Sequence, residues 1–139
     1  MMLILLFSLP ITVGFKLALP GVVLPAITVS TTSDHHTFEG ELYLYPARRA
    51  LVWGVGVNYR FTGAPAEFNP FFTCGFGFFR AMGKGITFFK SGGGLEYTRD
   101  KISGMMETST LLILSGRGKG RRPPYAPYIA IGGGYTVKE

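Results

Sequence analysis

Five charged residues lie at positions that would face the interior of a small β-protein, where they could form ion pairs: Lys16, Glu39, Glu41, Arg60 and Glu96. Each lies in a segment whose apolar residues occupy every second position, and each takes the opposite, polar phase of that alternation. Charges buried together must pair, because an unpaired buried charge costs several kcal/mol. We therefore predict an internal ion network in which Arg60 lies between Glu41 and Glu96.

Two other interpretations of these charges stay open. Some of them could lie near the ends of the fold in contact with water, because a single β-bulge shifts the phase of the alternation. The network could also plug or gate a narrow conduit, since a barrel of eight strands is about wide enough for its side chains to fill the interior.

The sequence shows no arrangement typical of catalysis or metal binding. Its serines occur in no G-x-S-x-G context. The two histidines, His35 and His36, are adjacent in a Ser/Thr/Asp stretch typical of a turn, and no third metal ligand is near them. The single cysteine, Cys74, cannot form an internal disulfide. We expect no catalytic residue, no cofactor, no metal and no enzymatic activity.

Length and composition indicate one domain, residues 1–139, built from strands. The chain combines 12 Phe, 7 Tyr and 20 Gly, and only 16% of its residues are charged. No run of about 18 apolar residues is free of Pro and Lys, so the sequence does not support a membrane helix. If the protein meets lipid, it does so with strands.

Strand periodicity is clearest in residues 51–62, where aromatic and β-branched residues alternate with Gly, Asn and Arg. The pattern recurs in 71–80, 90–99 and 127–137. One face is apolar with aromatic ends, whereas the other is small or polar. A wall that faces lipid around a polar lumen explains this arrangement directly.

Four weaker strands are expected at about 9–18, 22–31, 37–45 and 105–115, which gives eight strands and a closed antiparallel up-and-down transmembrane β-barrel. Residues 1–26 are either a signal-like segment or the first strands. With a signal, six or seven strands remain and closure becomes doubtful. Because an outer-membrane protein needs export, the strand interpretation leaves open a truncated gene product.

Three sequence segments carry a resemblance to a known family: GVGVNYRFTG, FNPFFTCGFGFFR and SGGGLEYTRDKISG. The region from Glu41 to Leu112 resembles the bacterial outer-membrane protein β-barrel domain, the family that includes the transmembrane part of outer-membrane protein A. The resemblance implies a small barrel in the bacterial outer membrane. It implies no particular activity, because such motifs specify architecture.

Aromatic residues near the strand ends are expected to form girdles at the two membrane interfaces. Trp53, Tyr59, Tyr97 and Tyr135 are the main candidates, and Tyr43 and Tyr45 also lie close to a strand end. For any one of them the alternative is an ordinary cross-strand pair.

One basic cluster falls in the long connection from Ser115 to Pro124, which strand counting places outside the cell. The cluster comprises Arg117, Lys119, Arg121 and Arg122, and the net charge of the chain is +6. Arg121 and Arg122 could bind lipopolysaccharide phosphates through charge-assisted hydrogen bonds. The alternative is a solvated loop without a partner.

We therefore expect a monomeric outer-membrane barrel that contacts membrane lipid and no nucleic acid. Its role would be structural, surface interaction or limited passage of small solutes. The rival is a soluble, lipocalin-like ligand-binding barrel, whose Phe-rich face would point inward. The direction of that face discriminates between the two.

Overall fold

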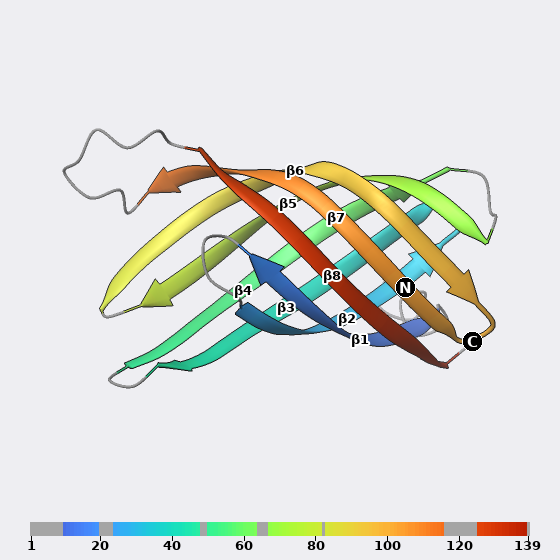
Figure 1. The fold of residues 1–139 in the computed structure, drawn as a ribbon, viewed down its shortest axis with the longest axis horizontal. Coiled ribbons are helices and arrows are strands. Elements are labelled where there is room, and N and C mark those ends of the chain that lie inside the picture. Colours follow the sequence, from blue (N-terminus) through green and yellow to red (C-terminus); the bar gives the residue numbers. More distant parts are fainter. Residues whose placement is uncertain are drawn as a thin grey trace, which may run out of the picture.

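The computed structural model describes residues 10–19, 24–47, 50–63, 67–81, 83–115 and 125–138. Within these ranges the chain forms the strands β1 (Ile11–Leu19), β2 (Leu24–Ser33), β3 (His36–Ala47), β4 (Ala50–Thr62), β5 (Phe68–Ala81), β6 (Lys84–Arg99), β7 (Ile102–Ser115) and β8 (Tyr125–Lys138) (Figure 1). They form a closed barrel in sequence order, which confirms the predicted eight-stranded antiparallel fold. No helix formed by the described residues is long and apolar enough to cross a membrane.

The N-terminal strands complete the barrel. Strand β1 pairs with β2 on one side and with β8 on the other, and both pairings are antiparallel. Of the two interpretations of residues 1–26, the structure therefore shows strands at 11–19 and from residue 24 onward. Residues 1–9 and 20–23 lie outside the described residues.

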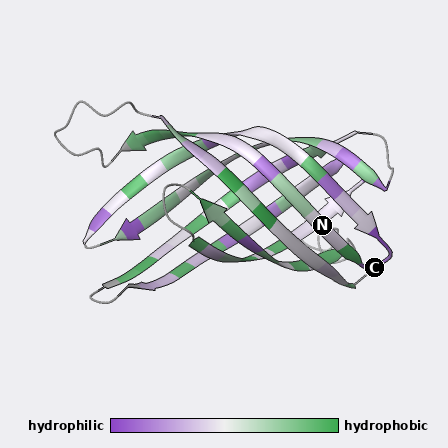
Figure 2. Cartoon of the chain, in the orientation of Figure 1, coloured by the Kyte–Doolittle hydropathy of each residue, from purple (hydrophilic) through white to green (hydrophobic). Residues whose placement is uncertain are grey.

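Alternate residues of each strand face the outside and the lumen. Val57 and Phe76 are 65% and 63% exposed, whereas the lumen-facing residues Asn58 and Thr73 are buried. Figure 2 shows this as alternating hydrophobic and hydrophilic bands along the strands. Aromatic and β-branched residues favour extended backbone, so the same residues that promote strands supply the apolar wall. The inward-pointing Phe-rich face of the lipocalin-like alternative is not observed.

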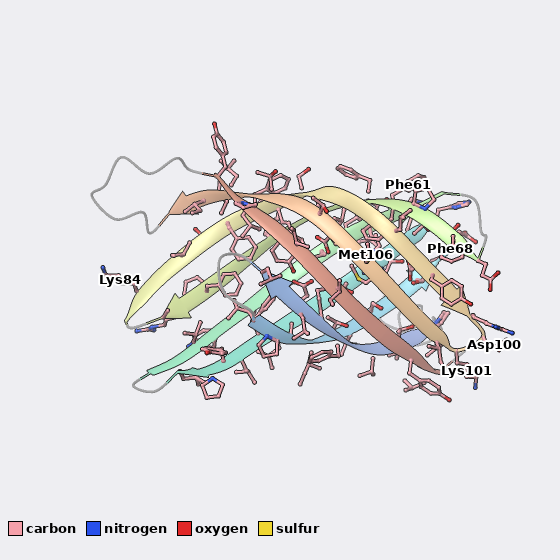
Figure 3. The ribbon with its side chains drawn as sticks, viewed as in Figure 1. Phe61, Phe68, Lys84, Asp100, Lys101 and Met106 are labelled. Atoms are coloured by element: carbon pink, nitrogen blue, oxygen red, sulfur yellow. The ribbon has the colours of Figure 1, made fainter. Side chains whose placement is uncertain are left out.

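The barrel has two different ends. The turn end carries the connections β2–β3, β4–β5 and β6–β7, and the loop end carries β1–β2, β3–β4, β5–β6 and β7–β8. In Figure 3, Asp100 and Lys101 mark the turn end and Lys84 marks the loop end. Asp34 and Asp100 have φ angles of 52° and 54°, in the left-handed region that Asp tolerates in tight turns. Each of these residues is the first of a two-residue turn: Asp34 and His35 join β2 to β3, and Asp100 and Lys101 join β6 to β7.

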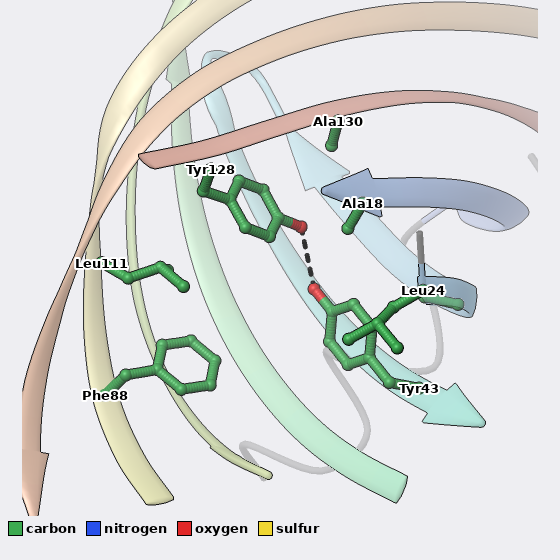
Figure 4. Close-up of a cluster of buried hydrophobic side chains, with 8 residues drawn as sticks. Ala18, Leu24, Tyr43, Phe88, Leu111, Tyr128 and Ala130 are labelled. Atoms are coloured by element: carbon green, nitrogen blue, oxygen red, sulfur yellow. Dashed lines mark hydrogen bonds between the residues drawn. The ribbon is translucent and has the colours of Figure 1, made fainter. Parts of the chain in front are cut away.

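A hydrophobic cluster fills the lumen toward the loop end. Its largest members are Tyr43, Phe88, Leu111 and Tyr128, and the Tyr43 and Tyr128 hydroxyls are hydrogen-bonded at 2.9 Å (Figure 4). Phe79 packs against it, with its ring centroid 5.0 Å from that of Phe88. The prediction that Tyr43 lies at the interface is therefore wrong. Tyr43 has the same strand phase as Glu39 and Glu41, so it points into the lumen.

Candidate functional site

Among the described residues, seven charged side chains lie inside the barrel wall. They come from five strands and are Lys16, Glu39, Glu41, Arg60, Lys90, Glu96 and Glu107. The alternation that turns apolar residues outward turns these side chains inward. The lumen thus contains a layer of charge between the hydrophobic cluster and the turn end.

Four of these residues form a ring of alternating charge. Lys16 Nζ donates to Glu41 and lies 3.7 Å from Glu107 Oε2. Lys90 Nζ closes the ring, 2.8 Å from Glu107 Oε1 and 3.7 Å from Glu41 Oε1. Each lysine therefore faces two carboxylates and each carboxylate faces two lysines, which compensates for the loss of water around them.

Arg60 joins a second group of charges nearer the turn end. Its Nη2 atom donates to Glu39 Oε2 at 2.8 Å, and its Nη1 atom donates to Glu96 Oε2 at 3.3 Å. Lys16 Nζ also donates to Glu39, at 2.7 Å, and so links this group to the ring. The guanidinium carbon lies 4.9 Å from the centre of the Phe71 ring, a cation–π distance.

The predicted position of Arg60 requires one correction. Arg60 lies between Glu39 and Glu96, whereas Glu41 accepts hydrogen bonds from Lys16 and Tyr43. The register explains the difference, because Arg60 is opposite Thr37 on β3. Glu39 is two positions along β3 from Thr37, so its side chain is a diagonal neighbour of Arg60 and can reach it. Glu41 is four positions from Thr37, which is farther than a diagonal neighbour.

Sequence reasoning missed Lys90, Glu107 and Tyr128. Lys90 is the first residue of the predicted strand 90–99 and has the same phase as Gly92, Gly94 and Glu96, so applying the alternation to it would have placed it in the lumen. Lys90 Nζ also lies 4.6 Å from the centre of the Tyr128 ring, which ties the ring of charge to the hydrophobic cluster.

A cavity of about 320 Å³ occupies the lumen between the charged layer and the turn end. Lys16, Glu39 and Arg60 line its inner part, and Asp34 and His35 line its mouth. Hydroxyl side chains dominate the wall: Thr12, Thr28, Ser30, Thr32, Thr37, Thr62, Thr98, Ser103 and Thr136. The cavity therefore offers many hydrogen-bonding groups around a charged floor.

The four expected girdle residues face outward near the two ends. Trp53 lies toward the loop end, with its ring centroid 5.6 Å from that of Phe78. Tyr59, Tyr97 and Tyr135 lie nearer the turn end, where the Tyr97 hydroxyl donates to Glu67 at 2.9 Å. Tyr59 and His36 are hydrogen-bonded at 2.5 Å. At the turn end, the outer wall therefore combines apolar tyrosine rings with hydroxyl groups that form hydrogen bonds.

The basic cluster Arg117, Lys119, Arg121 and Arg122 lies outside the described residues. The described basic residues of the loop end are Arg80 and Lys84, and both are exposed. Within the described ranges, no group of three or more His, Cys, Asp or Glu side chains could hold a metal ion.

Comparison with known proteins identifies the architecture. No family model matches the sequence, and no curated protein matches it. The structure is similar to the N-terminal β-barrel domain of Pseudomonas aeruginosa OprF, with a TM-score of 0.66 at 13% sequence identity, over 91% of this chain and 95% of that one. It is also similar to Neisserial surface protein A (NspA), with a TM-score of 0.56 at 10% identity, over 93% of this chain and 96% of that one. The chain therefore has the fold of the small outer-membrane β-barrels.

Proposed function

We propose that this chain is an integral, non-enzymatic protein of a bacterial outer membrane and that its role is structural or in surface interaction. The apolar outer wall carries the proposal. Twenty-five large hydrophobic residues among those described are more than 40% exposed. Contiguous apolar surface on this scale marks contact with a membrane or a partner, and a wall that surrounds a closed barrel fits lipid.

Membrane insertion can be tested with the purified full chain. We expect it to require detergent or lipid for solubility, to give a β-type circular dichroism spectrum, and to migrate differently on gels with and without heating. A chain that remains a folded, soluble monomer in plain buffer contradicts the proposal, because its outer wall would then face water.

The filled lumen favours a closed barrel over the passage of solutes. Tyr43, Phe88, Leu111 and Tyr128 are each no more than 5% exposed, and the charge ring lies beside them. A solute would have to displace both layers. In planar lipid bilayers we expect no stepwise conductance above the lipid background, with a known porin as the positive control. Sustained unitary conductance from the pure chain would instead support limited small-solute passage.

We also propose that the loop end contacts anionic lipid phosphates. Arg80 and Lys84 lie there, and the connections at this end carry Arg48, Arg49 and the basic cluster, with no acidic residue. Basic side chains near an anionic surface contribute about 1 kcal/mol each. Replacing Arg80 and Lys84 by Gln should weaken binding to vesicles that contain lipopolysaccharide and leave binding to neutral phosphatidylcholine vesicles unchanged. An equal effect on both vesicles would contradict this contact.

A further inference from the structure

The charges enclosed by the described strands do not cancel. Lys16, Arg60 and Lys90 supply three positive charges, whereas Glu39, Glu41, Glu96 and Glu107 supply four negative charges. Low dielectric strengthens every interaction in such a lumen and makes an uncompensated charge costly. The enclosed groups therefore favour one additional positive charge.

Glu96 is the carboxylate that is least compensated by its neighbours. Its side chain is 21% exposed, whereas those of Glu39, Glu41 and Glu107 are 2–6% exposed. Its ion pair with Arg60 is 3.3 Å long, compared with 2.7 Å for Lys16–Glu39 and 2.8 Å for Lys90–Glu107. Glu96 also lines the cavity, so the excess negative charge lies where a ligand can enter.

The surroundings of Glu96 suit a cation that donates hydrogen bonds. Thr98 follows it with the same strand phase, and Ser103 pairs with Thr98 across β6 and β7. Both hydroxyls line the cavity, and a hydroxyl oxygen can accept a hydrogen bond from an N–H group. At the mouth, Asp34 adds a further carboxylate, which would attract positive charge from solution.

We propose that this cavity binds a small organic cation whose ammonium or guanidinium group lies beside Glu96. Its volume of about 320 Å³ is at the lower end of the range of small-molecule pockets, about 300–1,000 Å³. A bare metal ion would leave most of that space empty, and no metal-binding group of side chains occurs among the described residues. An anion would meet Lys16 and Arg60 only where they are already bound to carboxylates.

Isothermal titration calorimetry on the full chain in uncharged detergent tests the site. The probes are putrescine, 1,4-butanediol of the same chain length without charge, and the dianion succinate. We expect binding of putrescine alone, weakened when NaCl rises from about 0.1 M to about 1 M, which shortens the Debye length from about 10 Å to about 3 Å. Equal binding of butanediol, or no binding of putrescine to the folded barrel, would overturn the proposal.

Two substitutions locate the binding. Glu96→Gln should weaken putrescine binding by about tenfold or more, the effect of losing one hydrogen bond to a charged group. Glu67→Gln is the matched control. Glu67 is also at the turn end and accepts a hydrogen bond from the Tyr97 hydroxyl, but it does not line the cavity. Unchanged affinity in Glu96→Gln would overturn the site.

A second variant keeps the test decisive if Glu96→Gln does not fold. Ser103→Phe fills the cavity with an aromatic ring and leaves all seven lumen charges in place. We expect this variant to lose putrescine binding while it retains the heat-dependent gel shift of a closed barrel. Retained binding in folded Ser103→Phe would place putrescine elsewhere and overturn the inference, and the proposed membrane location would be unaffected.

Discussion

Replacing Lys16 by methionine should strongly destabilise the barrel. The side chain of Lys16 is 1% exposed, and its ammonium group lies 2.7 Å from Glu39 and 3.7 Å from Glu107 and also donates to Glu41. Methionine is an unbranched side chain that fills irregular space well, so the main change is the loss of charge. Three carboxylates would lose their shared partner, and the enclosed net charge would change from −1 to −2.

The expected cost follows from the partners that remain. Removing one member of a buried ion pair costs about 3–5 kcal/mol. Lys90 stays 3.7 Å from Glu41 and Arg60 stays 2.8 Å from Glu39, so both carboxylates keep partial compensation. We therefore expect a loss near the lower bound, about 3 kcal/mol in the free energy of unfolding, or about a hundredfold in the unfolding equilibrium constant.

Urea unfolding in lipid vesicles, followed by Trp fluorescence, measures this loss. Trp53 is the single tryptophan and lies on the outer wall, so its emission should report transfer from lipid to water. The vesicles are made of neutral phosphatidylcholine, so Lys84→Met, at an exposed site, is the control and should change stability little. Adding Glu41→Gln to Lys16→Met should recover part of the loss. A cost for Lys16→Met below about 1 kcal/mol, as for an exposed pair, would refute the reasoning.

Three further predictions use the same unfolding assay. Val57→Arg, near the middle of β4 on the outer wall, should cost about 2–4 kcal/mol, whereas Leu51→Arg near the loop end should cost about 0–1 kcal/mol; equal costs would contradict a lipid-facing wall. Asp100→Val should cost about 1–2 kcal/mol because of its φ of 54°, and Asp100→Gly should be tolerated; equal stability of the two would show that the turn relaxes. Phe88→Ala should cost about 3–5 kcal/mol by leaving a cavity in the hydrophobic cluster, and a cost near zero would show that the cluster collapses freely.

The wall could be predicted from the sequence because alternation is local. Trp53, Val55 and Val57 alternate with glycines within one strand, and that phase alone places them outside. The hairpin pairing of neighbouring strands then fixes most of the barrel. The same local rule places Arg60 and Glu96 inside, which the structure shows.

The ion pairs could not be predicted in the same way. Lys16 on β1 meets Glu39 and Glu41 on β3, so this contact bypasses β2 and crosses the lumen. Such contacts depend on how far successive strands are staggered around the closed barrel, which no single hairpin determines. The tilt of the strands brings together residues that are too far apart in the sequence for a local pattern to relate them.

The pairing of β1 with β8 has a consequence for how the chain assembles. The Thr12 and Thr136 hydroxyls, 3.0 Å apart, join residues separated by 124 positions. Until that seam forms, both strands have unpaired backbone groups, which hydrocarbon cannot hydrate. Partly assembled intermediates should therefore be excluded from the bilayer interior, and insertion should be a single slow cooperative step that waits for the last strand to be synthesised.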